Sequence, residues 1–245
     1  MDDLMKAPVR RLKESFRALK WYEWLMAAVM VLIAVSAMVA AFSGTEEGGN
    51  PPWLAVVNFV SAVAGVFCVF FCAKASVSTH LFGLVNTAAY IVYLWYWHIW
   101  GTMCLELLVY LPMGVIGWIA WAGHRDETRD ELTKARRLTW RQNTLVAVLI
   151  MAGTGVSYLI LRQAGGSVIL WDAATVAIGI GATALQTLRY REQYAWWLIT
   201  DVVAVGMYIA HFDAVYLTKK SIYLIVAVIG LVNWMKLSGR NGTNQ

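Results

Sequence analysis

The sequence is poor in charge. Only 14% of the 245 residues are Asp, Glu, Lys or Arg, whereas 60% are hydrophobic. An ordinary soluble domain carries about 25% charged residues, so this composition excludes that class and indicates a membrane protein. The formal net charge of +5 does not indicate a nucleic-acid partner, because the basic residues cluster at the ends of apolar segments, as membrane topology requires.

Motifs for catalysis or metal binding are also missing. The three cysteines, Cys68, Cys72 and Cys104, lie in apolar segments, and no His or carboxylate joins them at metal-ligand spacing. We therefore interpret them as packing residues and predict no metal and no cofactor. The sequence contains neither a catalytic nucleophile–base set nor a Gly-rich phosphate-binding loop. These absences argue against a membrane-embedded enzyme and against ATP coupling.

What the sequence does contain is long apolar runs, each near the roughly 20 residues that a helix needs to cross a bilayer. We predict an all-α integral membrane protein with eight transmembrane helices. The polar segments around them are expected to be a basic, amphipathic cytoplasmic tail (1–20), a solvated linker (123–141) and a frayed cytoplasmic tail (236–245). The expected spans are 21–43, 53–73, 81–99, 103–122, 142–162, 171–188, 193–211 and 216–235.

The distribution of basic residues predicts the orientation. With the N-terminus inside, all Lys and Arg residues except Arg162, Lys219 and Lys220 fall on the cytoplasmic side. The positive-inside rule therefore places both termini in the cytoplasm.

An internal repeat is visible at the ends of two expected spans. Segments 114–121 and 227–234 both contain Val-Ile-Gly and both end in Trp. Counting back from these tryptophans, Glu106 and Lys219 each lie 15 residues earlier. Their matching positions toward the outer side predict either a salt bridge that ties the repeats together or an outer gate.

A second echo lies one span upstream in each half, where Phe82-x-x-x-Asn86 resembles Trp197-x-x-x-Asp201. Transporters built from parallel repeats bind substrate near mid-membrane where the repeats meet. The chain is therefore expected to hold two parallel three-helix repeats, with a linking helix between them and an extra helix in front. These are repeats 53–122 and 171–235, linking helix 142–162 and extra helix 21–43.

The strongest candidate site lies in the span that begins near residue 193. Tyr194, Trp197, Asp201 and Tyr208 stand at i, i+3, i+7 and i+14, so they share one helix face. A carboxylate at membrane depth costs about 2.5–3.5 kcal/mol on insertion scales, so it should face a cavity or a partner. We predict that the aromatic rings stack on an aromatic ligand, while Asp201 accepts hydrogen bonds or balances a positive charge.

Asn86 and Tyr90, one turn apart, are the candidates in the first repeat. An amide offers both donor and acceptor, so Asn86 would suit a carboxamide or a hydroxyl of the ligand. The alternative is a hydrogen bond between helices.

Several stretches resemble the PnuC family of bacterial vitamin transporters. They are the residues from Ala73-Lys74 to His80-Leu-Phe-Gly-Leu-Val-Asn86, then Leu111-Pro-Met-x-x-Ile-Gly-Trp118, Arg137-Leu-Thr-Trp140, Trp171-Asp-Ala-Ala-Thr175 and Trp197-x-x-x-Asp201 with Tyr208. The resemblance implies a fold like that of full-length SWEET transporters, with a 3+1+3 arrangement of helices. It also implies a homotrimer in the bacterial inner membrane. The implied activity is uptake of nicotinamide riboside by facilitated diffusion, coupled functionally to a cytoplasmic kinase that traps the substrate by phosphorylation.

Three departures from the family pattern keep other substrates open. Members that carry the riboside usually have Trp-x-x-Trp-x-x-x-Asn where this chain has Tyr194, Trp197 and Asp201, and Asn where it has Glu106. Relatives with this fold carry thiamine, riboflavin or deoxynucleosides, and Glu106 would bond the aminopyrimidine of thiamine. A proton-coupled carrier also stays open, because desolvated carboxylates titrate.

Overall fold

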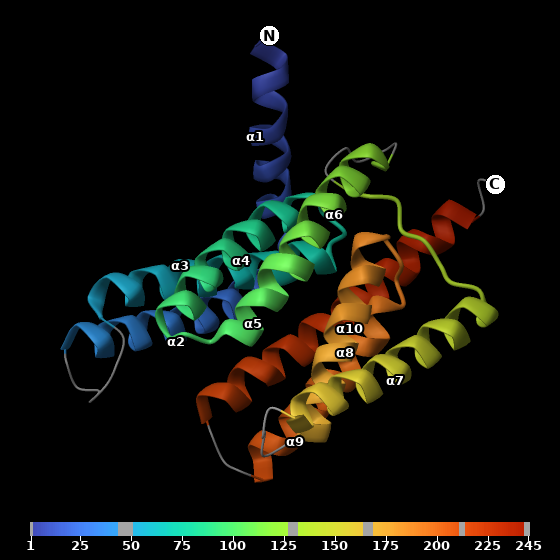
Figure 1. Ribbon diagram of the computed structural model, residues 1–245. Coiled ribbons are helices and arrows are strands. Elements are labelled where there is room, and N and C mark those ends of the chain that lie inside the picture. The colour runs from blue at the N-terminus through green and yellow to red at the C-terminus, as the bar shows by residue number, and fades with distance from the viewer. Residues whose placement is uncertain (1, 44–50, 127–131, 164–168, 211–213, 243–245) are drawn as a thin grey trace. The chain divides into compact units, whose positions relative to one another are not determined.

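The computed structural model describes residues 2–43, 51–126, 132–163, 169–210 and 214–242, and its regular structure in these ranges is helical (Figure 1). A helix covers each of the eight expected spans, the fourth being covered by α5, η1 and α6 together. The elements are α1 (Asp2–Arg17), α2 (Trp21–Ser43), α3 (Pro52–Ala73), α4 (Ser78–Tyr96), α5 (Trp100–Leu105), the π-helical segment η1 (Glu106–Tyr110), α6 (Leu111–Gly123), α7 (Trp140–Gln163), α8 (Ile169–Thr187), α9 (Gln193–Ala210) and α10 (Ala214–Gly242).

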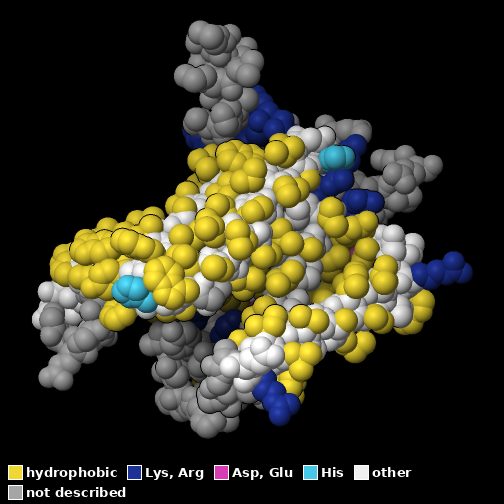
Figure 2. Space-filling model, in the orientation of Figure 1, with side chains coloured by type: hydrophobic (Ala, Val, Ile, Leu, Met, Phe, Trp, Pro, Cys, Tyr) yellow, Lys and Arg dark blue, Asp and Glu magenta, His cyan; other side chains and the backbone are white. Residues whose placement is uncertain are grey.

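The helices have the length and surface of membrane spans. Within the described residues, five helical runs are long and apolar enough to cross a bilayer: Trp21–Ser43, Pro52–Ala73, Thr102–Gly123, Trp140–Gln163 and Leu217–Gly239. Many large apolar side chains on them are exposed, and hydrophobic groups cover most of the surface seen in Figure 2. In water such a surface would be unfavourable, so the all-helical membrane class is confirmed.

The chain divides into two compact units, Met1–Thr133 and Lys134–Gln245. The extra helix α2 belongs to the first unit, and the linking helix α7 belongs to the second. The first unit therefore holds α1 to α6, and the second holds α7 to α10.

In the first unit, the N-terminal segment is a helix that packs onto the α3–α4 turn. The Phe16 ring lies 5.0 Å from Phe71 and 5.2 Å from Phe67, centroid to centroid. The buried Ser15 hydroxyl lies 2.7 Å from the Ser76 hydroxyl. The expected tail is thus anchored at its C-terminal end by aromatic packing and a buried hydrogen bond.

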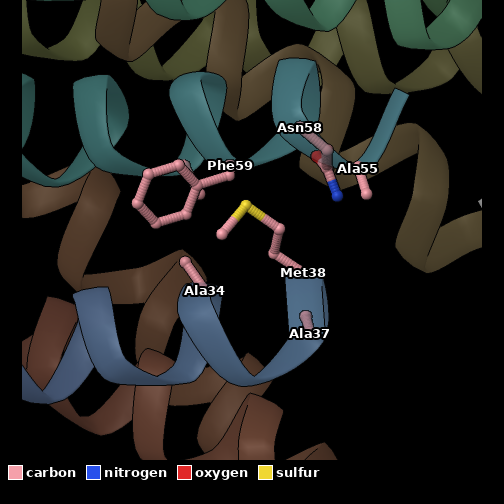
Figure 3. Close-up of a pocket in the computed structure, with 7 residues that line it drawn as sticks. Ala34, Ala37, Met38, Ala55, Asn58 and Phe59 are labelled. Carbon is pink, nitrogen blue, oxygen red and sulfur yellow. The ribbon is translucent and has the colours of Figure 1, made fainter. Parts of the chain in front are cut away.

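An ion pair fixes the start of α2 to the same turn. The Lys74 ammonium lies 2.8 Å from the Glu23 carboxylate, whose side chain is only 1% exposed. Farther along, α2 and α3 enclose a cavity of about 80 Å³, in which Met38 and Phe59 face each other beside Asn58 (Figure 3). This cavity contains none of the predicted site residues.

In the second unit, α7 packs closely on α8, because a Cβ on Gly181 would lie 2.7 Å from the Ile150 side chain. In the same unit, a buried cluster is formed by Leu138, Leu185 and Tyr190, and Trp196 packs against it. This cluster joins the linker to the α8–α9 turn.

The linker differs from the expected solvated segment. Its described part, 132–139, is not helical, as expected, but Leu132, Thr133 and Ala135 are buried. In the first unit, the Thr133 amide donates to the Ala75 carbonyl at 2.8 Å. In the second unit, the Arg136 amide donates to the Arg189 carbonyl at 2.8 Å. Backbone pairing with the turns removes this segment from solvent, so the expectation of a solvated linker was wrong here.

The expectation of a frayed C-terminal tail was wrong as far as Gly242, because α10 continues to that residue, and residues 243–245 lie outside the described residues. Leu237 is buried, and Arg191 donates a hydrogen bond to the Ser238 hydroxyl at 3.1 Å. These contacts hold helical turns that lie beyond the apolar run.

Candidate substrate-binding site

The two units repeat the same turn between their first two repeat helices. Ala75 and Arg189 both have a left-handed backbone, with φ of 58° and 67°. Each is followed by an amide that donates five residues back, Ser76 to Phe71 at 2.9 Å and Tyr190 to Leu185 at 2.8 Å. The left-handed residue of the second unit, Arg189, is numbered 114 higher than that of the first unit, Ala75.

The turn of the second unit is strongly basic but internally bonded. Arg189 donates to the Lys134 carbonyl at 3.3 Å, and the Arg136 guanidinium lies 4.7 Å from the centre of the Tyr190 ring. Burial, together with the nearby charge of Arg136, lowers the pKa of Arg189. The Lys134 carbonyl and the Tyr190 ring therefore contact two of these cations, and a third, Arg191, pairs with the Glu192 carboxylate at 3.1 Å.

A matching contact lies where the third repeat helix crosses the second. In the first unit, a Cβ on Gly117 would overlap the His80 ring, and in the second unit a Cβ on Gly230 would overlap the Tyr194 ring. His80 and Tyr194 again differ by 114, but Gly117 and Gly230 differ by 113. Each ring also contacts a fully buried tryptophan, Trp121 in the first unit and Trp234 in the second.

The π-helical segment explains this change of one residue. A π-turn holds one residue more than an α-turn. Segment η1 (Glu106–Tyr110) lies just before α6, whereas α10 is α-helical through the equivalent region. Glu106 therefore corresponds to Lys220, and the expected equivalence of Glu106 with Lys219 was wrong by one residue.

At equivalent positions along the helices, each unit has a pair of polar side chains, one on its second repeat helix and one on its third. In the second unit, the Lys220 ammonium donates to the Asp201 carboxylate at 3.3 Å, and Asp201 is buried. In the first unit, the Glu106 carboxyl group lies beside the Thr87 hydroxyl, close enough for the two side chains to interact. Asp201 therefore corresponds to Thr87, not to Asn86 as the sequence echo predicted, because the turn sets the register of these helices.

Sequence reasoning missed both partners, Lys220 and Thr87. One signal was present, because the members of each pair are separated by the same interval. Asp201 and Lys220 are 19 residues apart, as are Thr87 and Glu106.

Asn86 forms the hydrogen bond between helices that was the alternative to ligand binding. Its side-chain nitrogen donates to the Ser61 carbonyl at 2.7 Å and to the Ser61 hydroxyl at 3.1 Å. Within the described part of the chain, the Asn86 Oδ1 has no hydrogen-bond partner. Tyr90, on the next turn, stacks on Tyr93 with ring centroids 6.0 Å apart.

The aromatic residues of α9 are not equivalent. Tyr194 is buried and its ring packs against Gly230, so it contributes to the helix crossing. Trp197 is half-buried, and the side chain of Tyr208 lies outside the described residues. The placement of all three as ligand contacts stays a prediction.

The proposed outer gate also stays a prediction, since Glu106 belongs to the first unit and Lys219 to the second. Within its own unit, the Lys219 ammonium lies 5.8 Å from the centre of the Tyr223 ring.

A helical membrane chain with two structurally repeated units and charged pairs inside its helices is typical of a secondary transporter. The particular family follows from comparison with known proteins. The chain belongs to the nicotinamide mononucleotide transporter family, whose model matches residues 55–236. This result confirms the resemblance to the PnuC transporters.

Individual relatives cover nearly the whole chain. A nicotinamide riboside transporter PnuC from Neisseria mucosa is 32% identical over 231 residues, which cover 90% of this chain and 84% of that protein. One from Haemophilus influenzae is 31% identical, with 94% of this chain and 97% of that protein covered. The crystal structure of the vitamin B3 transporter PnuC superposes with a TM-score of 0.69 at 29% identity, covering 91% of this chain and 94% of that chain.

Proposed function

We propose that this protein takes up nicotinamide riboside across the bacterial inner membrane by facilitated diffusion, and that a cytoplasmic kinase traps the substrate by phosphorylation. The observation that carries the proposal is Asp201, a buried carboxylate inside an apolar helix, one turn after Trp197. The riboside is an aromatic cation attached to a sugar. A buried carboxylate and an aromatic ring are the groups that such a ligand needs.

Charge favours the riboside over the mononucleotide for which the family is named. The mononucleotide carries a phosphate, which adds about −1.5 to −2 charges at neutral pH. That phosphate would meet the carboxylate of Asp201, and like charges in a poorly solvated site repel strongly. The riboside brings only the positive ring.

Each site residue is given a role by its chemistry. In the second unit, Trp197 stacks on the nicotinamide ring, a cation–π contact that contributes about 2 kcal/mol when desolvated. Asp201 balances the ring charge or accepts from the ribose hydroxyls, while Tyr194 and Tyr208 shape the aromatic wall. In the first unit, the ligand contacts are Asn86, Tyr90 and Glu106, with the Asn86 Oδ1 accepting from a carboxamide or hydroxyl.

Binding to purified protein, followed by tryptophan fluorescence, tests this function. The ligands are nicotinamide riboside, nicotinamide mononucleotide, thiamine, riboflavin and deoxynucleosides. Saturable quenching by the riboside that is lost in Asp201→Ala and kept in Thr200→Ala supports the proposal. Thr200 is a matched control because it neighbours Asp201 and its hydroxyl bonds only its own helix, at the Trp196 carbonyl. Binding of none of these ligands would refute the proposal.

Thiamine is the second candidate, and Glu106 is the observation that favours it. Thiamine is also a cationic aromatic ligand, and a carboxylate at Glu106 could bond its aminopyrimidine, a group that the riboside lacks. Tight binding of thiamine that is lost in Glu106→Gln would reassign the substrate while keeping the family and the fold.

Transport without ion coupling is tested in proteoliposomes that contain no kinase. Facilitated diffusion brings the riboside to equal concentrations on both sides and no further. Accumulation that collapses with a proton gradient would instead indicate a proton-coupled carrier.

The assembly and topology are part of the same proposal. All eight helical segments cross the bilayer in a 3+1+3 SWEET-like arrangement, with both termini in the cytoplasm, and three copies form a homotrimer. Labelling of cysteines introduced near each terminus in intact cells tests the orientation, and native mass spectrometry tests the trimer. The outer gate is tested by exchanging the charges of Glu106 and Lys219, and normal uptake by the exchanged variant would refute it.

A further inference from the structure

We propose that Lys220 is an internal substitute for the substrate cation: it neutralises Asp201 in the empty transporter and is displaced when a cationic ligand arrives. This inference rests on the proposed function, because it assigns a specificity-determining role to a residue beside the proposed binding carboxylate. Its consequence is that Lys220 limits the preference for cations, since a cationic ligand must compete with the lysine for Asp201 and an uncharged ligand of the same shape need not.

The geometry of the pair carries the first step. The Lys220 Nζ lies 3.3 Å from the Asp201 Oδ1, and the exposed fractions of the two side chains are 26% and 8%. An isolated buried carboxylate is costly, so the empty site requires a counter-charge. Lys220 supplies that charge at the same carboxylate that would balance the nicotinamide ring.

The Tyr223 ring can stabilise the Lys220 ammonium after its displacement from Asp201. In the structure, with Lys220 still paired with Asp201, the ammonium lies 5.7 Å from the centre of this ring, about one helical turn further along α10. An aromatic face attracts a cation, and a lysine stem is flexible enough to move its charge without moving the helix. The partial exposure of Lys220 leaves room for this movement.

Comparison with the first unit indicates that Lys220 neutralises the Asp201 carboxylate and is not needed for the two helices to cross. At the equivalent point, the Glu106 carboxyl group lies beside the Thr87 hydroxyl instead of a cation. The same crossing therefore forms in the first unit with no lysine at the corresponding position. A cation is present in the second unit, where the second repeat helix carries the carboxylate of Asp201.

The test compares two ligands that differ in ring charge, nicotinamide riboside and its uncharged dihydro form, on the purified full chain at pH 8. The measured quantity is the ratio of their dissociation constants. In Lys220→Gln the cation no longer competes with a lysine, so we expect the preference for the charged ligand to rise about tenfold. Lys236→Gln, which removes an exposed lysine of the same helix, is the matched control and should leave the ratio within about twofold.

Two further variants keep the test decisive. Lys220→Arg keeps a competing cation and should restore the wild-type ratio. Asp201→Asn combined with Lys220→Gln removes both charges without leaving one unpaired, and it should lose the preference for the cation. The double variant also serves if Lys220→Gln alone does not fold.

The outcomes separate the inference from the proposed function. A wild-type protein that binds the riboside, together with an unchanged ratio in Lys220→Gln, overturns the inference alone. An equal weakening of both ligands makes Lys220 a structural residue and also overturns it. A wild-type protein that binds neither ligand overturns the proposed function, and the inference falls with it.

Discussion

The Tyr194 ring occupies the space that a Cβ on Gly230 would fill, and His80 stands in the same relation to Gly117. In both units, a ring on the second repeat helix thus lies against a glycine on the third. The contact sets how closely these helices approach, and through that distance it sets which polar residues can meet farther along the helices.

Gly230→Ala should destabilise the protein although alanine is the better helix former. The new methyl group overlaps the Tyr194 ring, and overpacking of this kind costs about 1–3 kcal/mol. A melting experiment in detergent should show a lower midpoint. Gly239→Ala is the matched control, because no atom lies within 4 Å of a Cβ there. An unchanged midpoint in Gly230→Ala would show that the ring moves aside freely.

Glu23→Ala should be one of the more damaging single changes in the first unit. It leaves the Lys74 ammonium, only 13% exposed, without its carboxylate, and it removes the acceptor of the Lys20 amide. Loss of one partner of a buried ion pair costs about 3–5 kcal/mol.

The comparison for this ion pair is Glu14→Ala. The Arg10–Glu14 pair is exposed, with an N–O distance of 3.8 Å, and such pairs contribute about 0.3–0.5 kcal/mol. Equal melting midpoints for the two variants would contradict the structural role of Glu23.

Deletion of Leu108 should preserve both folding and transport, because η1 holds the one residue by which this part of the first unit is longer than that of the second. The deletion converts η1 into an α-helical turn, and the spacing from Glu106 to the α6 glycine becomes that from Lys220 to Gly230 in α10. Glu106 then keeps its place beside Thr87, and Gly117 keeps its contact with His80. We expect a folded protein in size-exclusion chromatography and uptake of labelled riboside close to that of the wild type. Leu108→Ala keeps the π-turn, and its side chain is 70% exposed, so it should also transport normally. Loss of uptake by the deletion variant alone would show that the π-turn does more than hold the extra residue.

Asn86→Ala and Ser61→Ala together distinguish helix packing from ligand binding. Asn86→Ala removes the bonds from its amide to the Ser61 carbonyl and hydroxyl, whereas Ser61→Ala removes only the bonds of the hydroxyl and leaves the one at the carbonyl. Each should lower stability by about 0.6 kcal/mol, the average for such bonds in membranes. Only Asn86→Ala also removes the Oδ1, so it alone should weaken riboside binding, by about two- to tenfold. If the two variants bind equally well, Asn86 is a packing residue.

Much of this protein was determined by its sequence. A backbone inside lipid must satisfy its own hydrogen bonds, so the apolar runs could only be helices, and the structure has a helix over each expected span. Polar groups are costly in such runs, so Asp201, Glu106 and Asn86 stood out without any structure. The repeated Val-Ile-Gly segments also marked the glycines that contact His80 and Tyr194.

Only the tertiary structure decided how these residues pair. The π-turn at η1 shifts the register of the first unit by one residue, which replaces Lys219 with Lys220 as the counterpart of Glu106. A change from i→i+4 to i→i+5 hydrogen bonding has no signature in composition or periodicity, because neighbouring helices select it through packing. The buried linker and the extended α10 have the same cause, since their polar sequences bond to turns: the linker to those at Ala75 and Arg189, and α10 to Arg191.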